Sequence, residues 1–190
     1  MTAVTLSRPS WPSLAVGAAP AVVGLAALLG RPWFLPHGVA VGWRVLFFLA
    51  LGALGMAWSL QASDAPAGRR VTLGALALGT LAFAGGRALV DVPWPPSQLG
   101  VALALNGLAA VTEEMFFRRY LYGLLAPFGA GVAIAVSASA FGLAHVTVWG
   151  WWVLPLDLAA GLVLSWQRAA SGRWSVPAAT HVVANSLALL

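Results

Sequence analysis

The chain has 190 residues, of which 61% are hydrophobic and only 8% are charged. Soluble domains carry roughly 25% charged residues, so this composition excludes an ordinary soluble domain and predicts a polytopic membrane protein. The net charge of +5 comes from ten arginines set against five acids. These arginines are scattered at the ends of apolar runs, a pattern typical of membrane topology rather than of nucleic-acid binding. Without cysteine, disulfides and thiol chemistry are also excluded.

Apolar segments of membrane-spanning length predict an all-α, polytopic membrane helical bundle with about seven transmembrane helices. In chain order they cover residues 12–30, 39–60, 71–90, 98–125, 130–148, 151–168 and 174–190, with proline and glycine between them. The first segment is interpreted as a retained helix rather than a signal peptide, because Pro12 and Pro20 interrupt it.

Arginine placement favours an orientation with the N-terminus inside and the C-terminus outside. In this orientation the cytoplasmic side holds Arg8, Arg69, Arg70, Arg168 and Arg173, and the other side holds Arg31, Arg44 and Arg87. Arginine, alanine and glycine are frequent while lysine is absent, which indicates a GC-rich bacterial genome. The predicted location is therefore the inner (cytoplasmic) membrane of a bacterium.

The fourth segment ends in the charged sequence TEEMFFRRYLYG, residues 112–123. Burying an ionisable group in a membrane costs about 3 kcal/mol or more, so each such group is a functional hypothesis. Glu114 and Arg118 are four residues apart on one helix face and are predicted to form an ion pair. Glu113 points about 100° away and has Phe117 at the next turn, so the sequence predicts no local counter-ion and an available carboxylate.

Further polar groups are predicted at matching depth on neighbouring helices. The turn between the fourth and fifth segments is centred near residue 129, sixteen residues after Glu113 and sixteen before His145. In an antiparallel pair these residues lie at equal depth, roughly 20 Å from the turn. His181 and Asn185 share one face of the seventh segment.

This set suits peptide hydrolysis by an activated water. A carboxylate can act as general base and an imidazole beside it can orient the water. A second imidazole and an amide can stabilise the oxyanion. Alone, each histidine or asparagine is more often a helix-packing group, and the Glu–Arg pair alone is compatible with a structural role. His37 is interpreted as a solvated loop residue, and Asp157 stays open between a catalytic role and pairing with an arginine or a histidine.

Three motifs in order resemble the CPBP family, named for CAAX prenyl proteases and bacteriocin-processing enzymes and also called Abi. They are EEMFFR (Glu113–Arg118), FGLAH (Phe141–His145) and HVVAN (His181–Asn185). The resemblance covers about residues 98–190, which we interpret as the catalytic core, while residues 1–97 would form three N-terminal transmembrane helices. It implies an intramembrane endopeptidase that acts on a membrane-associated or C-terminally anchored protein or peptide, either as a CAAX-type or as a sorting and processing protease.

The resemblance also implies roles for individual residues. Glu113 and His145 would hold and activate the water, and His181 and Asn185 would form the oxyanion site. Glu114 and Arg118 would support the fold of the site. A metal-free mechanism is favoured because HExxH is absent. If the enzyme depends on zinc, its ligands would be Glu113, His145 and His181.

Two other functions stay open. One is a non-catalytic membrane immunity or partner-binding protein that retains the motifs. The other is a small transporter or proton path that uses Asp157, although neither inverted repeats nor broken helices are visible. Rhomboid chemistry is disfavoured because GxSG is absent, and an aspartyl mechanism because Asp91 and Asp157 lack a GxGD context.

Overall fold

The computed structural model describes residues 11–56, 66–89 and 96–190, and every regular element in these ranges is helical. The long helices are α1 (Trp11–Leu29), α3 (Val41–Met56), α4 (Arg69–Ala88), α5 (Leu99–Glu114), α7 (Ala130–Trp149), α8 (Leu154–Ser171) and α9 (Ser175–Leu187). The short elements are α2 (Arg31–Phe34), a π-helix (Met115–Leu121), α6 (Tyr122–Leu125) and the 3-10 turns Ala126–Phe128 and Trp151–Val153. The predicted all-α class is confirmed.

Each predicted apolar segment coincides with one of these helical stretches. Within the described ranges, Arg69–Ala88, Leu99–Phe128 and Ala130–Trp149 are long and apolar enough to cross a membrane. The count of seven spans stays a prediction, and the expected ends of the second and third segments, at residues 60 and 90, lie outside the described residues.

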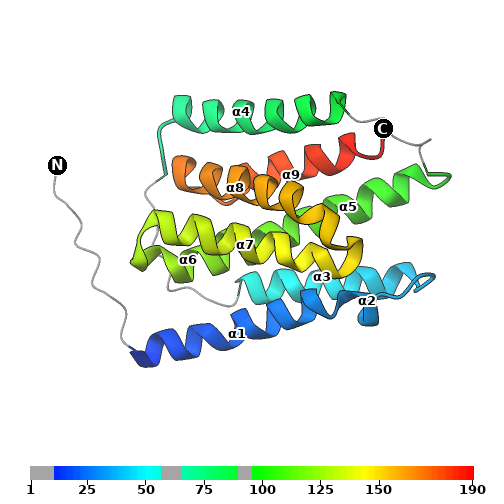
Figure 1. Ribbon diagram of the computed structural model, residues 1–190, viewed down its shortest axis with the longest axis horizontal. Coiled ribbons are helices and arrows are strands. Elements are labelled where there is room, and N and C mark those ends of the chain that lie inside the picture. The colour runs from blue at the N-terminus through cyan, green and yellow to red at the C-terminus, as the bar shows by residue number, and fades with distance from the viewer. Residues whose placement is uncertain (1–10, 57–65, 90–95) are drawn as a thin grey trace.

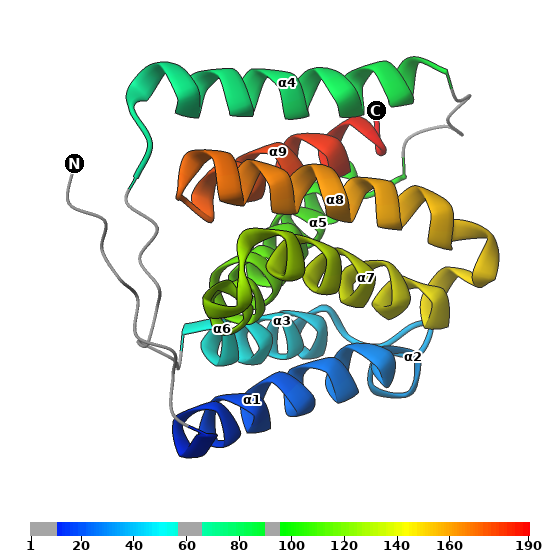
Figure 2. The same ribbon diagram turned by 60° about the vertical axis from the view of Figure 1, so that its left-hand side comes forward.

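The long helices run side by side along the length of the molecule (Figure 1). Helix α4 lies at one edge, against α8 and α9, and α1 lies at the opposite edge (Figures 1 and 2). Between these edges, α7 packs on α8, and α5 packs on both α9 and α3. The helices that carry the predicted site residues, α5, α7 and α9, therefore lie in the interior of the bundle rather than at its edges.

The outward faces of α1, α3 and α4 are apolar. Large exposed hydrophobic side chains include Val22 and Val23 on α1, Leu46 and Leu49 on α3, and Leu78 and Leu81 on α4. In water, contiguous exposure of this kind would drive association. In a bilayer the lipid chains cover it, so these faces fit a membrane protein.

Small residues bring the inner helices into close contact. A methyl group added at Gly161 of α8 would lie 2.9 Å from the carbonyl oxygen of Ala138 on α7. One added at Gly55 of α3 would lie 2.6 Å from the backbone of Met115. Glycine at these two positions lets the backbones approach one another, as is common between membrane helices.

The sequence predicted a regular helix through the charged end of the fourth segment, but the structure differs there. Directly after Glu113 and Glu114, the chain continues for seven residues as a π-helix. Phe116, Phe117 and Arg118 in this turn are fully buried. The sequence MFFRRYL contains no glycine or proline that would indicate a change of helix type. We therefore attribute the π-helix to tertiary packing around this buried turn. π-Turns of this kind are frequent at functional sites.

Candidate active site

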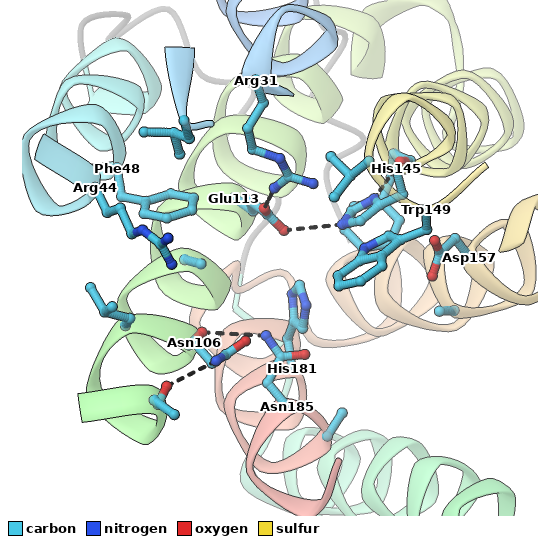
Figure 3. Close-up of a pocket in the computed structure, with 18 of the residues that line it drawn as sticks. Arg31, Arg44, Phe48, Asn106, Glu113, His145, Trp149, Asp157, His181 and Asn185 are labelled. Atoms are coloured by element: carbon cyan, nitrogen blue, oxygen red, sulfur yellow. Dashed lines mark hydrogen bonds and ion pairs between the residues drawn. The ribbon is translucent and has the colours of Figure 1, made fainter. Parts of the chain in front are cut away.

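A cavity of about 620 Å³ opens between the helices of the bundle. Its wall includes Glu113 from α5, His145 from α7, and His181 and Asn185 from α9 (Figure 3). The structure therefore brings all four predicted catalytic residues to one cavity, although they lie up to 72 positions apart in the chain. Their chemical roles stay predictions.

Glu113 is almost completely buried, with 3% of its side chain exposed. Its Oε1 accepts a hydrogen bond of 2.9 Å from Nη1 of Arg31, the first residue of α2. The other oxygen, Oε2, lies 3.8 Å from Nε2 of His145. The expectation that this carboxylate has no counter-ion holds only for its own helix, because the cation comes from a segment 82 residues away.

His145 faces Glu113 at equal depth, as the spacing about the turn predicted. Its Nδ1 lies 2.9 Å from the carbonyl oxygen of Phe141, one turn earlier on α7. Since a carbonyl oxygen only accepts, Nδ1 carries the proton and donates it. In the neutral ring, Nε2 then presents a lone pair to the Glu113 side of the cavity.

Glu114 turns away from the cavity into a buried network. Its Oε1 accepts hydrogen bonds from Nη1 of Arg118, at 2.8 Å, and from Nδ1 of His181, at 2.9 Å. The predicted Glu114–Arg118 pair is thus present, with both side chains fully buried. Arg118 also donates from Nη2 to the carbonyl oxygen of Gly161, at 3.1 Å. The network fixes the orientation of the His181 ring.

Phe141 separates the two histidines. Its ring centroid lies 4.5 Å from that of His145, in a tilted arrangement. It lies 5.6 Å from that of His181, in an edge-to-face contact. The Arg118 guanidinium carbon sits 4.5 Å from the same ring centroid. The phenylalanine of FGLAH therefore packs against the side chains of all three motifs, which explains the pairing of an aromatic and a histidine four residues apart.

Asn185 lies further along α9 on the face that carries His181. Its Nδ2 donates to the carbonyl oxygen of Asn106 on α5, at 3.3 Å, and Asn106 also lines the cavity. This bond uses one of the two Asn185 amide protons. The second remains available to a group in the cavity.

The remaining predictions for polar residues have mixed outcomes. No hydrogen bond or ion pair joins Asp157 to Arg118 or Arg119 in the part of the chain that the structure describes. Asp157 instead lines the cavity, and its Oδ2 is buried without a hydrogen-bond partner among the described residues. Arg119 donates to the carbonyl oxygen of Gly55. His37 is exposed, as expected, and lies at the rim of the cavity.

Sequence reasoning missed Arg31 and Arg44 as residues of the site. Both line the cavity, whereas the sequence analysis treated them as markers of the membrane surface. No spacing signal connects them to the motifs, because they lie on other helices. Arg168, expected at the membrane surface, is likewise buried, and its Nε donates to the carbonyl oxygen of Arg118 at 3.1 Å.

The side chains do not gather as a metal site. Among the described residues, no group of three or more histidine, aspartate or glutamate side chains is close enough to hold an ion. The hypothetical zinc set of Glu113, His145 and His181 is divided, since His181 turns Nδ1 to Glu114 and Arg31 occupies Oε1 of Glu113.

Comparison with known proteins finds a family that resembles the C-terminal part of the chain. Residues 95–187 match the family model described as type II CAAX prenyl endopeptidase Rce1-like. The matched region runs from the start of α5 to the end of α9 and contains all three motifs, while Arg31 and Arg44 lie outside it. No curated protein and no solved structure matches the chain. The resemblance to CPBP proteases is confirmed, because residues 95–187 are similar to the Rce1-like type II CAAX prenyl endopeptidases.

Proposed function

We propose that this protein is an intramembrane endopeptidase that cleaves a membrane-associated or C-terminally anchored protein with a water activated by Glu113 and His145. The family supports a protease at a general level. The observation that carries the mechanism is the facing pair of acceptor atoms, Glu113 Oε2 and His145 Nε2, 3.8 Å apart at the cavity wall. The proposed setting is the inner membrane of a bacterium, with the N-terminus inside.

The two acceptors are spaced to share one water molecule. A separation of 3.8 Å is too long for a direct hydrogen bond between them. A water within about 2.8 Å of both atoms would donate one hydrogen bond to each. Its oxygen lone pairs would then point into the cavity, toward a peptide carbonyl.

Arg31 suits this arrangement because it binds the other oxygen of the carboxylate. Its bond to Oε1 holds Glu113 in one orientation and leaves Oε2 for the water. The cation also offsets the cost of burying a charged carboxylate in a membrane protein. Arg31 is therefore a positioning residue in this mechanism.

In the first step, Glu113 takes a proton from the water as its oxygen bonds to the carbonyl carbon. The carbonyl oxygen becomes an oxyanion, for which His181 and Asn185 are the donors on the cavity wall. Since Nδ1 of His181 donates to Glu114, its Nε2 would donate to the oxyanion in the doubly protonated form of the ring. The C–N bond then breaks, and the proton held by Glu113 passes to the leaving amine. The products are a carboxylate and an amine.

Reconstituted protein tests this proposal. Purified protein in lipid vesicles would be incubated with peptides carrying C-terminal membrane anchors, with and without a prenyl group, and the products identified by mass spectrometry. We expect cleavage by the wild type and a loss of about 10²–10⁴-fold in His145→Ala, the usual size of general acid–base assistance. Ser186→Ala is the matched control, because the Ser186 hydroxyl donates to the carbonyl oxygen of Val182 on its own helix, α9.

Two results would contradict the proposal. One is equal cleavage by the wild type and His145→Ala. The other is no cleavage of any peptide by folded wild-type protein, which would favour the non-catalytic immunity or partner-binding function.

A further inference from the structure

Two arginines from the N-terminal helices face the cavity that holds the motifs. Arg31 begins α2, and Arg44 lies in the first turns of α3. Both line the cavity, and Arg44 lies on the opposite side from Asp157 (Figure 3). Neither belongs to the region that matches the family, so the motif chemistry does not explain them.

Among the residues that the structure describes, no acid pairs with the charge of Arg44. Its Nε is buried without a hydrogen bond, and no ion pair joins Arg44 to any acid within residues 11–56, 66–89 and 96–190. An unpaired arginine inside a membrane protein is costly, and such residues mark functional sites. Of the acids at the cavity, Glu113 is already bonded to Arg31, and Asp157 lies across from Arg44. The side of the cavity formed by α2 and α3 thus carries an excess of positive charge.

We propose that Arg44, which lines the same cavity as Arg31, forms a subsite for a carboxylate of the peptide substrate, next to the scissile bond. This inference rests on the proposed peptidase function. A guanidinium fork matches the two oxygens of a carboxylate in a bidentate contact. The subsite fixes the direction of the bound peptide, with its carboxylate toward α3 and the opposite side of the scissile bond toward Asp157.

The carboxylate has two chemical sources, the free C-terminus of the peptide and an acidic side chain close to the cleavage site. A peptide fits better than a lipid headgroup because Arg44 shares one cavity with Glu113, His145 and His181 inside the bundle. Phe48, one turn after Arg44 on α3, lines the same cavity and offers an apolar contact to the residue that carries the carboxylate.

Three matched peptides distinguish these sources. The first has a free C-terminal carboxylate, the second is amidated at that end, and the third is amidated but has glutamate as its last residue. A hydrogen-bonded charged contact is worth about 1.5–3 kcal/mol. We therefore expect the wild type to prefer a carboxylate peptide over the plain amide by roughly 10–100-fold in kcat/KM, chiefly through KM. Preference for the first peptide alone assigns the C-terminus, and preference for the third assigns the side chain.

Substitution of Arg44 tests whether the preference comes from this residue. In Arg44→Gln the ratio of carboxylate to amide peptide should fall to about one, and Arg44→Lys should keep part of it because the charge remains without the fork. Arg70→Gln, at an exposed position in the first turn of α4, is the control and should keep the full ratio.

Peptide binding separates a failure of the subsite from a failure of the peptidase function. Dissociation constants of the same three peptides would be measured on Glu113→Gln protein, with Arg44 intact and with Arg44→Gln. With Arg44 intact, the carboxylate peptide should bind roughly 10–100-fold more tightly than the amide peptide, even if no peptide is cleaved. With Arg44→Gln, this difference in dissociation constant should disappear. Equal binding of carboxylate and amide peptides, or a preference that survives Arg44→Gln, would overturn the inference and leave Arg44 as a contact for lipid phosphate.

Discussion

Glu113 and Glu114 are neighbours in the chain, yet they serve two different regions of the molecule. On the Glu114 side, a fully buried carboxylate holds Arg118 and His181 within 2.9 Å and does not line the cavity that Glu113 lines. On the Glu113 side, the carboxylate lines a cavity together with His145 and the arginines of the N-terminal helices. The consecutive positions place the two groups on different helix faces, so one is enclosed by packing and the other meets the cavity.

This difference separates structural from chemical functions. Changes on the Glu114 side should lower the free energy of unfolding, because they leave buried charges unpaired. Changes on the Glu113 side should lower the rate of cleavage while the protein still folds and inserts. The following predictions test that division, starting with the largest expected effect.

Arg118→Ala should destabilise the protein by about 3–5 kcal/mol, the usual cost of breaking a buried ion pair from one side. It leaves Glu114 buried without its cation and removes the bond to the Gly161 carbonyl. The yield of folded protein and its thermal unfolding in detergent would measure the effect, with Arg70→Ala as an exposed control. Wild-type stability in Arg118→Ala would show that the network is not structural.

Asn185→Ala should lower kcat by about 10²–10³-fold, as expected for removal of one oxyanion donor. Stability should change little, because the lost bond to the Asn106 carbonyl is long, at 3.3 Å. Steady-state cleavage and thermal unfolding would be compared with Ser186→Ala on the same helix. A large loss of stability with unchanged kcat would instead make Asn185 a packing residue.

Gly161→Ala should cost about 1–3 kcal/mol through overpacking. The added methyl group would lie 2.9 Å from the Ala138 carbonyl oxygen and would push α8 away from α7. Gly107→Ala is a matched control, because a methyl group there meets no atom within 4 Å. Denaturation of the two variants in the same detergent would measure the difference, and equal stability would refute the close approach of α7 and α8.

Ser137→Ala should have the smallest effect, a loss of about 1 kcal/mol in stability with unchanged cleavage. Its hydroxyl bonds that of Ser165, at 3.0 Å, between α7 and α8 and away from the cavity. Both properties would be measured on one preparation. A loss of activity without a loss of stability would extend the functional region beyond the cavity.

The sequence predicted the parts of the site that follow from helix geometry. The four-residue spacing of Glu114 and Arg118 and the equal distances of Glu113 and His145 from the turn both reappear as contacts. The bond from His181 to Glu114 was not predictable, because no periodicity relates α9 to α5. Arg31 and Arg44 were missed for the same reason. From their positions in the sequence, these two arginines were interpreted only as indicators of membrane orientation.

Burial explains the other differences between prediction and structure. The π-turn at Met115–Leu121 lies in a segment packed by α3, α7 and α8, so contacts from distant parts of the chain set its winding. Arg168 sits near the end of an apolar run, where a surface position is the normal expectation. In the structure, a backbone carbonyl of the π-helix binds its guanidinium inside the bundle.

Single-turnover cleavage by Glu113→Gln tests the central claim most directly. The substitution keeps the size of the side chain and its bonding to Arg31 but removes the base that takes the proton from water. With folding and insertion unchanged, the account predicts a fall in rate of about 10²–10⁴-fold relative to wild type. Wild-type cleavage by Glu113→Gln would contradict it.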